Sequence, residues 1–281
     1  MPRLARSWKL SAFLLLPALC AGTPLVRAQQ AGTPPALDAI LNRLEANLHH
    51  YDAGVPSLFC DEHVVSSQSV RDTPIENSVT DSIFRLRRTP GPGGTTSLVE
   101  SREIKTVDGK RPQSKDMDGP TLLSGMFEGG LAVVSRSQAA CMKYTLEKPD
   151  KKQPGGPYVV RFETELAPQN LNSCFLTEKS KGLVDIDPAS MQVTHLEITT
   201  PRHVISAGGD FAPRMIGKRE LAVDYAPVPL GDSTFWLPSA IGMTTGTGFA
   251  SHDKVWSFQA EYRNCHRLEV TTRMLPAGPA Q

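Results

Sequence analysis

Apolar and polar side chains alternate along several segments of this 281-residue chain. The clearest runs are 158–165, 221–225 and 256–263. Because successive side chains of a strand point to opposite faces, each run buries one face of a sheet and leaves the other in water. The sequence shows no alternation of strand and helix patterns that would indicate a parallel α/β fold. The pattern therefore predicts a large antiparallel sheet with one solvated face.

Further strands and turns are expected around these runs. The additional strands are predicted at 58–70, 79–88, 95–107 and 268–274. Asp108-Gly109 follows the third predicted strand and is a favoured hairpin turn. The chain also contains 22 Gly and 23 Pro, which suits many turns between strands better than it suits long helices.

One helix is expected before the first strand, from about Pro35 to Tyr51. Apolar side chains recur there at helical spacing and form a single stripe. The stripe consists of Leu37, Ile40, Leu41, Leu44 and Leu48. Gly54 and Pro56 are expected to end the helix.

The segment 119–136 is apolar and rich in glycine, which is unusual in the middle of a β protein. We expect a short helical or loop segment that lies over the concave face of the sheet. Five of its side chains are spaced like one face of a helix and are candidates to face a ligand: Leu122, Leu123, Met126, Phe127 and Leu131. A helix that simply caps the core explains the same spacing equally well.

The first 28 residues have the features of a signal peptide. The positive charges that open the chain are Arg3, Arg6 and Lys9. The apolar run 10–19 is too short for a stable transmembrane helix, and Val26-Arg27-Ala28 resembles a cleavage site. We therefore expect an exported protein of the periplasm or the extracellular space. An anchor helix is an alternative, and so is lipidation of Cys20, although Leu19 is a poor residue before a lipidated cysteine.

Four cysteines remain after the expected leader: Cys60, Cys141, Cys174 and Cys265. In an exported chain four cysteines suggest two disulfides, with three possible pairings. We expect Cys141 to pair with Cys174 across a strand-turn-strand run, and Cys60 to pair with Cys265 between the first strand and one of the last. One disulfide with two buried thiols is the alternative.

No pattern in the chain assigns a catalytic residue, a metal ligand or a cofactor, and none is expected. Cys60-Asp61-Glu62-His63 groups four ligand-type residues, but strand alternation would place Cys60 and Glu62 on one face and the other two opposite. Carboxylates such as Glu100 and Glu103 could supply a glycosidase pair, as in any chain of this size. The Gly-x-Ser-x-Gly elbow of α/β-hydrolases does not occur.

Charge and hydropathy limit the partners. The formal net charge is +1 and charged residues make up 21%, so no broad basic field favours nucleic acid or anionic lipid. No apolar stretch after Leu19 approaches the roughly 20 residues of a transmembrane helix. We therefore expect no nucleic-acid partner and no transmembrane segment once the leader is removed, and the sequence leaves the oligomeric state open.

The segment 182–197 is the most distinctive in the chain, with a strand, an Asp-Pro turn and a second strand. Asp187 can cap the turn through its carboxylate, and this explains the residue better than a catalytic role does. The hairpin resembles the pattern Gly-x-Val-x-Ile-Asp-x-x-Thr-x-x-Val-x-x-Leu/Phe of the LolA-like group. The matching residues are Gly182, Val184, Ile186, Asp187, Val193 and Leu196, while Ser190 stands where Thr is usual.

The order of the elements is also similar to that of the LolA-like group. This group includes periplasmic lipoprotein carriers, mycobacterial lipid-binding lipoproteins and the sensor domain of the RseB type. The segments 225–230 and 235–238 resemble a strand pair of a poorly characterised secreted branch. The cysteines depart from the general pattern, and the carrier's lipoprotein-contacting arginine matches no residue here.

The resemblance implies an α+β, mostly β fold: an open antiparallel half-barrel with an N-terminal helix and a short helical segment on its concave face. We expect a signal peptide at 1–28, a linker at 29–35, one domain at 36–275 and a flexible tail at 276–281. The implied function is an exported binding protein that holds an apolar ligand, a lipid or a lipid-modified partner. An envelope sensor or scaffold without a carried ligand, and a secreted hydrolase, are the alternatives.

Overall fold

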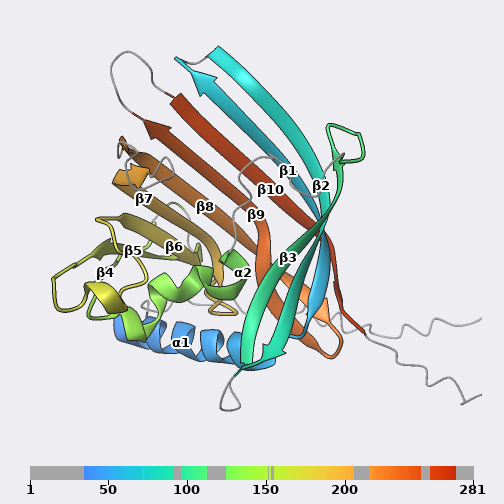
Figure 1. Cartoon of the computed structure of the whole chain (residues 1–281). Coiled ribbons are helices and arrows are strands. Elements are labelled where there is room, and N and C mark those ends of the chain that lie inside the picture. The colour runs from blue at the N-terminus through green and yellow to red at the C-terminus, as the bar shows by residue number, and fades with distance from the viewer. Residues whose placement is uncertain are drawn as a thin grey trace, which may run out of the picture. The chain divides into compact units, whose positions relative to one another are not determined.

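The computed structural model describes residues 35–71, 73–91, 96–112, 125–150, 152, 155–205, 215–247 and 254–269. The strands in this part of the chain are β1 (Leu58–Val70), β2 (Thr73–Pro90), β3 (Thr96–Val107), β4 (Met142–Leu146), β5 (Tyr158–Thr164), β6 (Lys181–Ile186), β7 (Val193–Ile205), β8 (Met215–Leu230), β9 (Ser233–Thr247) and β10 (Lys254–Arg267). They form one antiparallel sheet in the order β3-β2-β1-β10-β9-β8-β7-β6-β5-β4. The sheet curves but does not close, so β3 and β4 are its outer strands (Figure 1).

The helices lie on the inner side of this curved sheet (Figure 1). The long one is α1 (Leu37–Gly54), and a short α2 (Met126–Gly129) continues into the 3₁₀ turns η2 (Gly130–Val134) and η3 (Arg136–Gln138). A further 3₁₀ turn, η4 (Leu171–Ser173), lies between β5 and β6. The open half-barrel with an N-terminal helix that the resemblance implies is therefore confirmed.

The hydrophobic core fills the space between the inner face of the sheet and the helices. Its fully buried side chains include Ile40, Leu58, Phe84, Leu86, Phe162, Ile186, Leu196, Leu237 and Ile241. Phe127 of α2 stands at its centre, with ring centroids 4.3 Å from Phe84 and 4.8 Å from Tyr262. Each large apolar side chain buried in this way contributes about 1.5–3 kcal/mol, so the core holds α2 against the sheet.

The alternation predicted from the sequence is present in the structure. Val160 and Phe162 are buried while Arg161 between them is exposed, and β10 buries Phe258, Ala260 and Tyr262 in the same way. Asp108 and Gly109 both adopt positive φ, as the predicted hairpin turn requires.

The described strands differ from the predicted ones in two places. The last strand was expected at 268–274, but β10 already ends at Arg267 and residues 268–269 are not in a strand. The short β4, by contrast, was not expected, because its five residues give too brief an alternation to recognise. The leader, residues 119–124 and the tail from 270 onward lie outside the described residues.

Two residues, Gly182 and Asp187, shape the Asp-Pro hairpin. Gly182 has no room for a side chain, because a Cβ there would lie 2.0 Å from the Glu197 carbonyl oxygen and 2.5 Å from the Phe162 ring. The Asp187 carboxylate accepts hydrogen bonds from the backbone N–H of Ser190 (2.7 Å) and from its hydroxyl (2.6 Å). These hydrogen bonds hold the turn, and they lower the pKa of Asp187.

The helix α1 is attached to this hairpin. The Asn47 side chain donates a hydrogen bond of 2.6 Å to the carbonyl oxygen of Met191, which adopts a positive φ in the turn. The turn that the sequence motif specifies therefore also fixes the position of α1 over the sheet.

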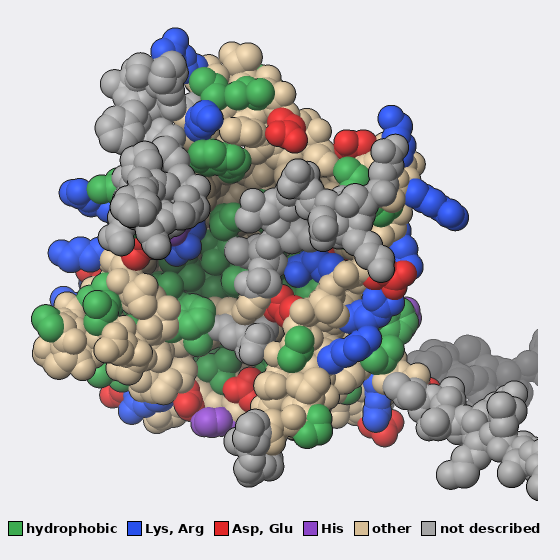
Figure 2. Space-filling view, viewed as in Figure 1, with side chains coloured by type: hydrophobic (Ala, Val, Ile, Leu, Met, Phe, Trp, Pro, Cys, Tyr) green, Lys and Arg blue, Asp and Glu red, His purple; other side chains and the backbone are tan. Residues whose placement is uncertain are grey.

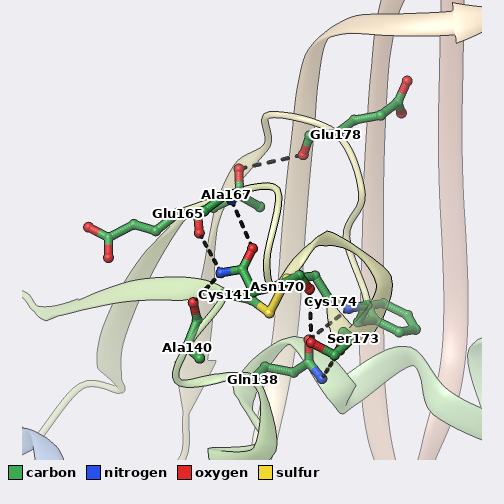
Figure 3. Close-up of a disulfide and its surroundings, with 11 residues drawn as sticks. Gln138, Ala140, Cys141, Glu165, Ala167, Asn170, Ser173, Cys174 and Glu178 are labelled. Carbon is green, nitrogen blue, oxygen red and sulfur yellow. Dashed lines mark hydrogen bonds between the residues drawn. A yellow bond between two sulfur atoms is a disulfide. The ribbon is translucent and has the colours of Figure 1, made fainter.

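Two disulfides join distant parts of the chain, with the pairing expected from the sequence. Cys60 of β1 is bonded to Cys265 of β10, and Cys141 is bonded to Cys174. Asn170 supports the second bond by donating to the carbonyl oxygens of Ala140 and Glu165 (Figure 3). The loop between β5 and β6 is thereby held against the segment before β4.

Candidate ligand cavity

A cavity of about 340 Å³ lies between α1, the α2–η2 segment and the strands β8 and β9. Its lining residues are Glu45, Leu48, His49, Tyr51, Asp52, Met126, Phe127, Gly130, Leu131, Ala132, Ser135, Ser137, Tyr225, Trp236 and Pro238. Figure 2 shows the inner face of the sheet hollowed, with hydrophobic side chains gathered in the hollow.

The cavity brings together the three predicted ligand-facing residues that the structure describes. Met126, Phe127 and Leu131 line it, while Leu122 and Leu123 lie outside the described residues. Leu48, the last member of the apolar stripe of α1, lines the cavity from the opposite side.

The α2–η2 segment is held in place by hydrogen bonds from three different elements. The Glu100 carboxylate of β3 accepts from the backbone N–H of Gly125 and of Phe127, both at 2.8 Å. The Tyr51 hydroxyl of α1 donates to the Phe127 carbonyl oxygen at 2.7 Å, and the Tyr144 hydroxyl donates to that of Val133 at 2.7 Å. Since charge-assisted hydrogen bonds are the strong ones, Glu100 anchors the beginning of the segment.

Gly130 lets this segment approach the sheet closely. A Cβ at this position would lie 2.8 Å from the Met126 Cε and 3.2 Å from the Tyr225 hydroxyl oxygen. One glycine of this glycine-rich segment therefore allows a close contact between η2 and β8.

One side of the cavity carries acidic groups. Glu45, His49 and Asp52 follow one another on the same face of α1, and the His49 Nε2 lies 3.3 Å from the Glu45 carboxylate. Glu45 also accepts a hydrogen bond from the Arg136 backbone N–H at 2.8 Å. Burial raises the pKa of Asp52, because the charged carboxylate is partly withdrawn from water.

Tyr225 of β8 was identified from the sequence as a buried strand residue and not as a cavity residue. Its side chain is 6% exposed, and its hydroxyl has no hydrogen-bond partner among the described residues. Burial raises the pKa of this hydroxyl, so it stays neutral. Alternation along β8 could show that Tyr225 faces inward, but only the position of η2 shows that it faces a cavity.

A buried ion pair on the inner face was also missed. The Arg102 guanidinium of β3 donates to the Glu62 carboxylate of β1 at 2.8 Å, and the Ser82 hydroxyl donates to the same carboxylate at 2.5 Å. Arg102 also lies over the Phe84 ring, 5.1 Å from its centroid. Arg102 and Glu62 are 40 positions apart in the sequence. No pattern in the sequence shows that they meet in the fold.

The group Cys60-Asp61-Glu62-His63 divides between the two faces as expected. Cys60 is bonded to Cys265 and Glu62 is buried, while His63 turns outward and pairs with Asp81 at 2.7 Å. Within the described residues there is no cluster of three or more His, Cys, Asp or Glu that could hold a metal ion.

His195 is the histidine most closely surrounded by carboxylates. Its Nδ1 lies 2.6 Å from Asp224 and its Nε2 lies 3.2 Å from Glu197. Because both ring nitrogens are paired with carboxylates, this group is an ion pair on the outer face of the sheet and leaves no nitrogen for a serine nucleophile.

No helix in the described part of the chain is both long and apolar enough to cross a membrane.

No family model and no curated protein matches the sequence. Among solved structures, the chain is similar to a LolA superfamily protein from Nitrosomonas europaea, with 10% identity, a TM-score of 0.31, and 83% of this chain and 94% of that chain covered. A DUF1329 family protein from Desulfovibrio piger gives 7% identity and a TM-score of 0.34, with 82% and 94% covered.

A structure of the MucA/MucB complex of Pseudomonas aeruginosa is also similar, with 8% identity, a TM-score of 0.19, and 80% of this chain and 93% of that chain covered.

Proposed function

We propose that this chain is an exported binding protein that holds an apolar ligand, or the lipid of a lipid-modified partner, on the concave side of the half-barrel. The observation that supports this proposal is the cavity of about 340 Å³, which lies in the lower part of the size range of small-molecule sites. Apolar walls from Met126, Phe127, Leu131 and Trp236 would gain roughly 25 cal/mol for each Å² of ligand surface they cover.

Export is part of the proposal and has its own support. The disulfides Cys60–Cys265 and Cys141–Cys174 suit an oxidising compartment, which agrees with the leader expected at 1–28. N-terminal sequencing of the exported protein should find Gln29 at or near the first position. An intact Met1 or a lipidated Cys20 would contradict this.

To test whether the protein binds an apolar ligand, the purified exported protein is extracted with organic solvent. The extracted compounds are then identified by mass spectrometry. The matched control is Ala132→Phe, because Ala132 lines the cavity and a phenyl group there would occupy part of it. We expect an apolar compound in the wild-type extract that is depleted in the extract of the variant. Equal amounts in both would place any bound lipid outside the cavity.

A second candidate, a sensor or scaffold of the same fold, is supported by a different surface. Leu171 and Phe175 are 38% and 45% exposed in the loop between β5 and β6, which the Cys141–Cys174 disulfide tethers. Exposed apolar side chains on a tethered loop are a feature of protein contacts. A photo-crosslinking residue at position 175, compared with one at the exposed polar position Gln259, should then capture a discrete partner in the exporting cell.

A further inference from the structure

The unpartnered hydroxyl of Tyr225 indicates what kind of ligand the cavity takes. Tyr225 lines the cavity with its side chain 6% exposed, and its hydroxyl finds no hydrogen-bond partner among the described residues. Tyr51, the other tyrosine of the lining, differs because its hydroxyl donates to the Phe127 carbonyl oxygen. A buried donor without an acceptor is unfavourable, so an acceptor brought by a ligand would be favoured at this position.

Met126 and the Tyr225 hydroxyl lie near each other beside Gly130. A Cβ on Gly130 would be 2.8 Å from the Met126 Cε and 3.2 Å from the Tyr225 hydroxyl oxygen. The end of a methionine side chain is flexible and adapts to irregular surroundings. Contact between a ligand and the buried Tyr225 hydroxyl would require neighbouring side chains such as Met126 to turn aside.

The charged side chains of α1 that line the cavity determine which polar groups of a ligand the cavity can accept. Glu45 and Asp52 are the carboxylates of the lining, and His49 is the one basic side chain among the lining residues. Two carboxylates in a partly closed site repel a ligand carboxylate, since Coulomb interactions strengthen as water is excluded. Burial raises the pKa of Asp52 and Glu45 adds to the effect, whereas His49 and Arg88 lower it.

From these observations, and resting on the proposed function, we propose that the cavity selects an uncharged amphiphile with an oxygen acceptor, such as an ester, over the corresponding fatty-acid anion. The Tyr225 hydroxyl donates to that oxygen, the apolar walls cover the chain, and the carboxylates of α1 exclude the anion.

The test uses isothermal titration calorimetry of the exported protein with two probes of the same acyl chain, a monoacylglycerol and the ionised fatty acid. We expect the monoacylglycerol to bind about tenfold more tightly or better, which corresponds to about 1.4 kcal/mol. In the double variant Glu45→Gln/Asp52→Asn, binding of the fatty acid should improve about fivefold, while binding of the monoacylglycerol changes less than twofold. Equal affinity of the two probes for the wild type would overturn the proposal.

The variant Tyr225→Phe tests the hydrogen bond. Since the hydroxyl is unpartnered, its removal should leave the melting temperature unchanged or raise it, and monoacylglycerol affinity should fall about five- to tenfold. The control is Tyr262→Phe, which removes the hydroxyl of a buried tyrosine that does not line the cavity, and which should leave probe affinity unchanged.

The outcomes separate this inference from the proposed function. If neither probe binds the wild type, both proposals fail. If the probes bind but Tyr225→Phe lowers the melting temperature and leaves their affinity unchanged, the hydroxyl belongs to a structural water network. The cavity would then bind ligands without the selectivity proposed here.

Discussion

At the scale of single residues, the motif of the Asp-Pro hairpin contains one residue that permits a close backbone contact and one that forms the hydrogen bonds of the turn. Gly182 is required because the Glu197 carbonyl and the Phe162 ring occupy the space of a side chain. Asp187 is required because its carboxylate accepts two hydrogen bonds from Ser190. The role of Asp187 follows from local turn geometry and was predicted, whereas that of Gly182 depends on contacts with the neighbouring strands β5 and β7. The position of Tyr225 in a cavity wall could not be predicted, because it depends on a segment almost 100 residues away in the sequence.

Replacing Gly182 by Ala should lower the free energy of unfolding by about 1–3 kcal/mol, because the new methyl group meets backbone and an aromatic ring in a packed sheet. The matched control is Gly242→Ala in β9, where a Cβ meets no atom within 4 Å. Urea unfolding of both variants measures the difference. A Gly182→Ala protein as stable as the Gly242→Ala protein would show that the close approach is not present in solution.

Glu178 should make stability depend on pH in the acidic range. Burial raises its pKa, but hydrogen bonds from the Val204 backbone N–H (2.8 Å) and from His203 (2.8 Å) outweigh burial and lower it overall. A lowered pKa in the folded state adds stability above the unfolded pKa of about 4.5, and this stability is lost as the pH falls through the folded value.

The variant Glu178→Gln should therefore be less stable than the wild type at pH 7 and closer to it near pH 3. Urea unfolding at the two pH values provides the measurement. A difference between the two proteins that stays constant with pH would indicate that the carboxylate contributes through shape and not through its charge.

At the scale of elements, the strands follow from alternation, and the course of the α2–η2 segment follows from its tertiary contacts. The sequence predicted a helical or loop segment over the concave face and left open whether it faces a ligand, and so could act as a gate, or simply caps the core as a plug. Glu100 accepts hydrogen bonds from this segment, and Tyr51 and Tyr144 donate to it, which attaches the segment to β3, α1 and β4. Such anchors favour a plug whose backbone stays in place, with motion confined to side chains such as Met126.

Phe127→Ala should lower the free energy of unfolding by about 3–5 kcal/mol, because Phe127 is 2% exposed and packs against Phe84 and Tyr262. Phe175→Ala is the control, since Phe175 is 45% exposed and should cost far less. Uptake of a fluorescent fatty amphiphile is measured in the same variants. A small loss of stability with altered uptake in Phe127→Ala would support a gate instead of a plug.

At the scale of the whole molecule, period-two alternation is enough to predict a large antiparallel sheet, because it specifies one buried face. The open half-barrel was implied by the resemblance to the LolA-like group. What the sequence leaves open is how completely the helices fill that face. The size of the remaining cavity depends on contacts such as that of Gly130 with Tyr225, which join residues far apart in the chain. The disulfides add a second constraint, because Cys60 and Cys265 lie 205 positions apart.

Removing the Cys60–Cys265 bond should destabilise the protein more than removing the Cys141–Cys174 bond. For separations of 205 and 33 positions, the loop-entropy model gives about 5 and about 4 kcal/mol respectively. Serine replacement of each pair, followed by urea unfolding, measures both effects, and non-reducing peptide mapping of the wild type verifies the pairing. A peptide that links Cys60 to Cys141 would refute it.

Trp236 in the cavity wall can report directly whether an apolar ligand occupies the cavity beside α2, as we propose. With Trp256→Phe, Trp236 is the tryptophan that remains after the expected leader, which contains Trp8. An uncharged amphiphile with bromine in its acyl chain quenches tryptophan fluorescence on contact. We expect saturable quenching of Trp236 that Ala132→Phe abolishes. Quenching that is absent, or that is unchanged in Ala132→Phe, would contradict the account.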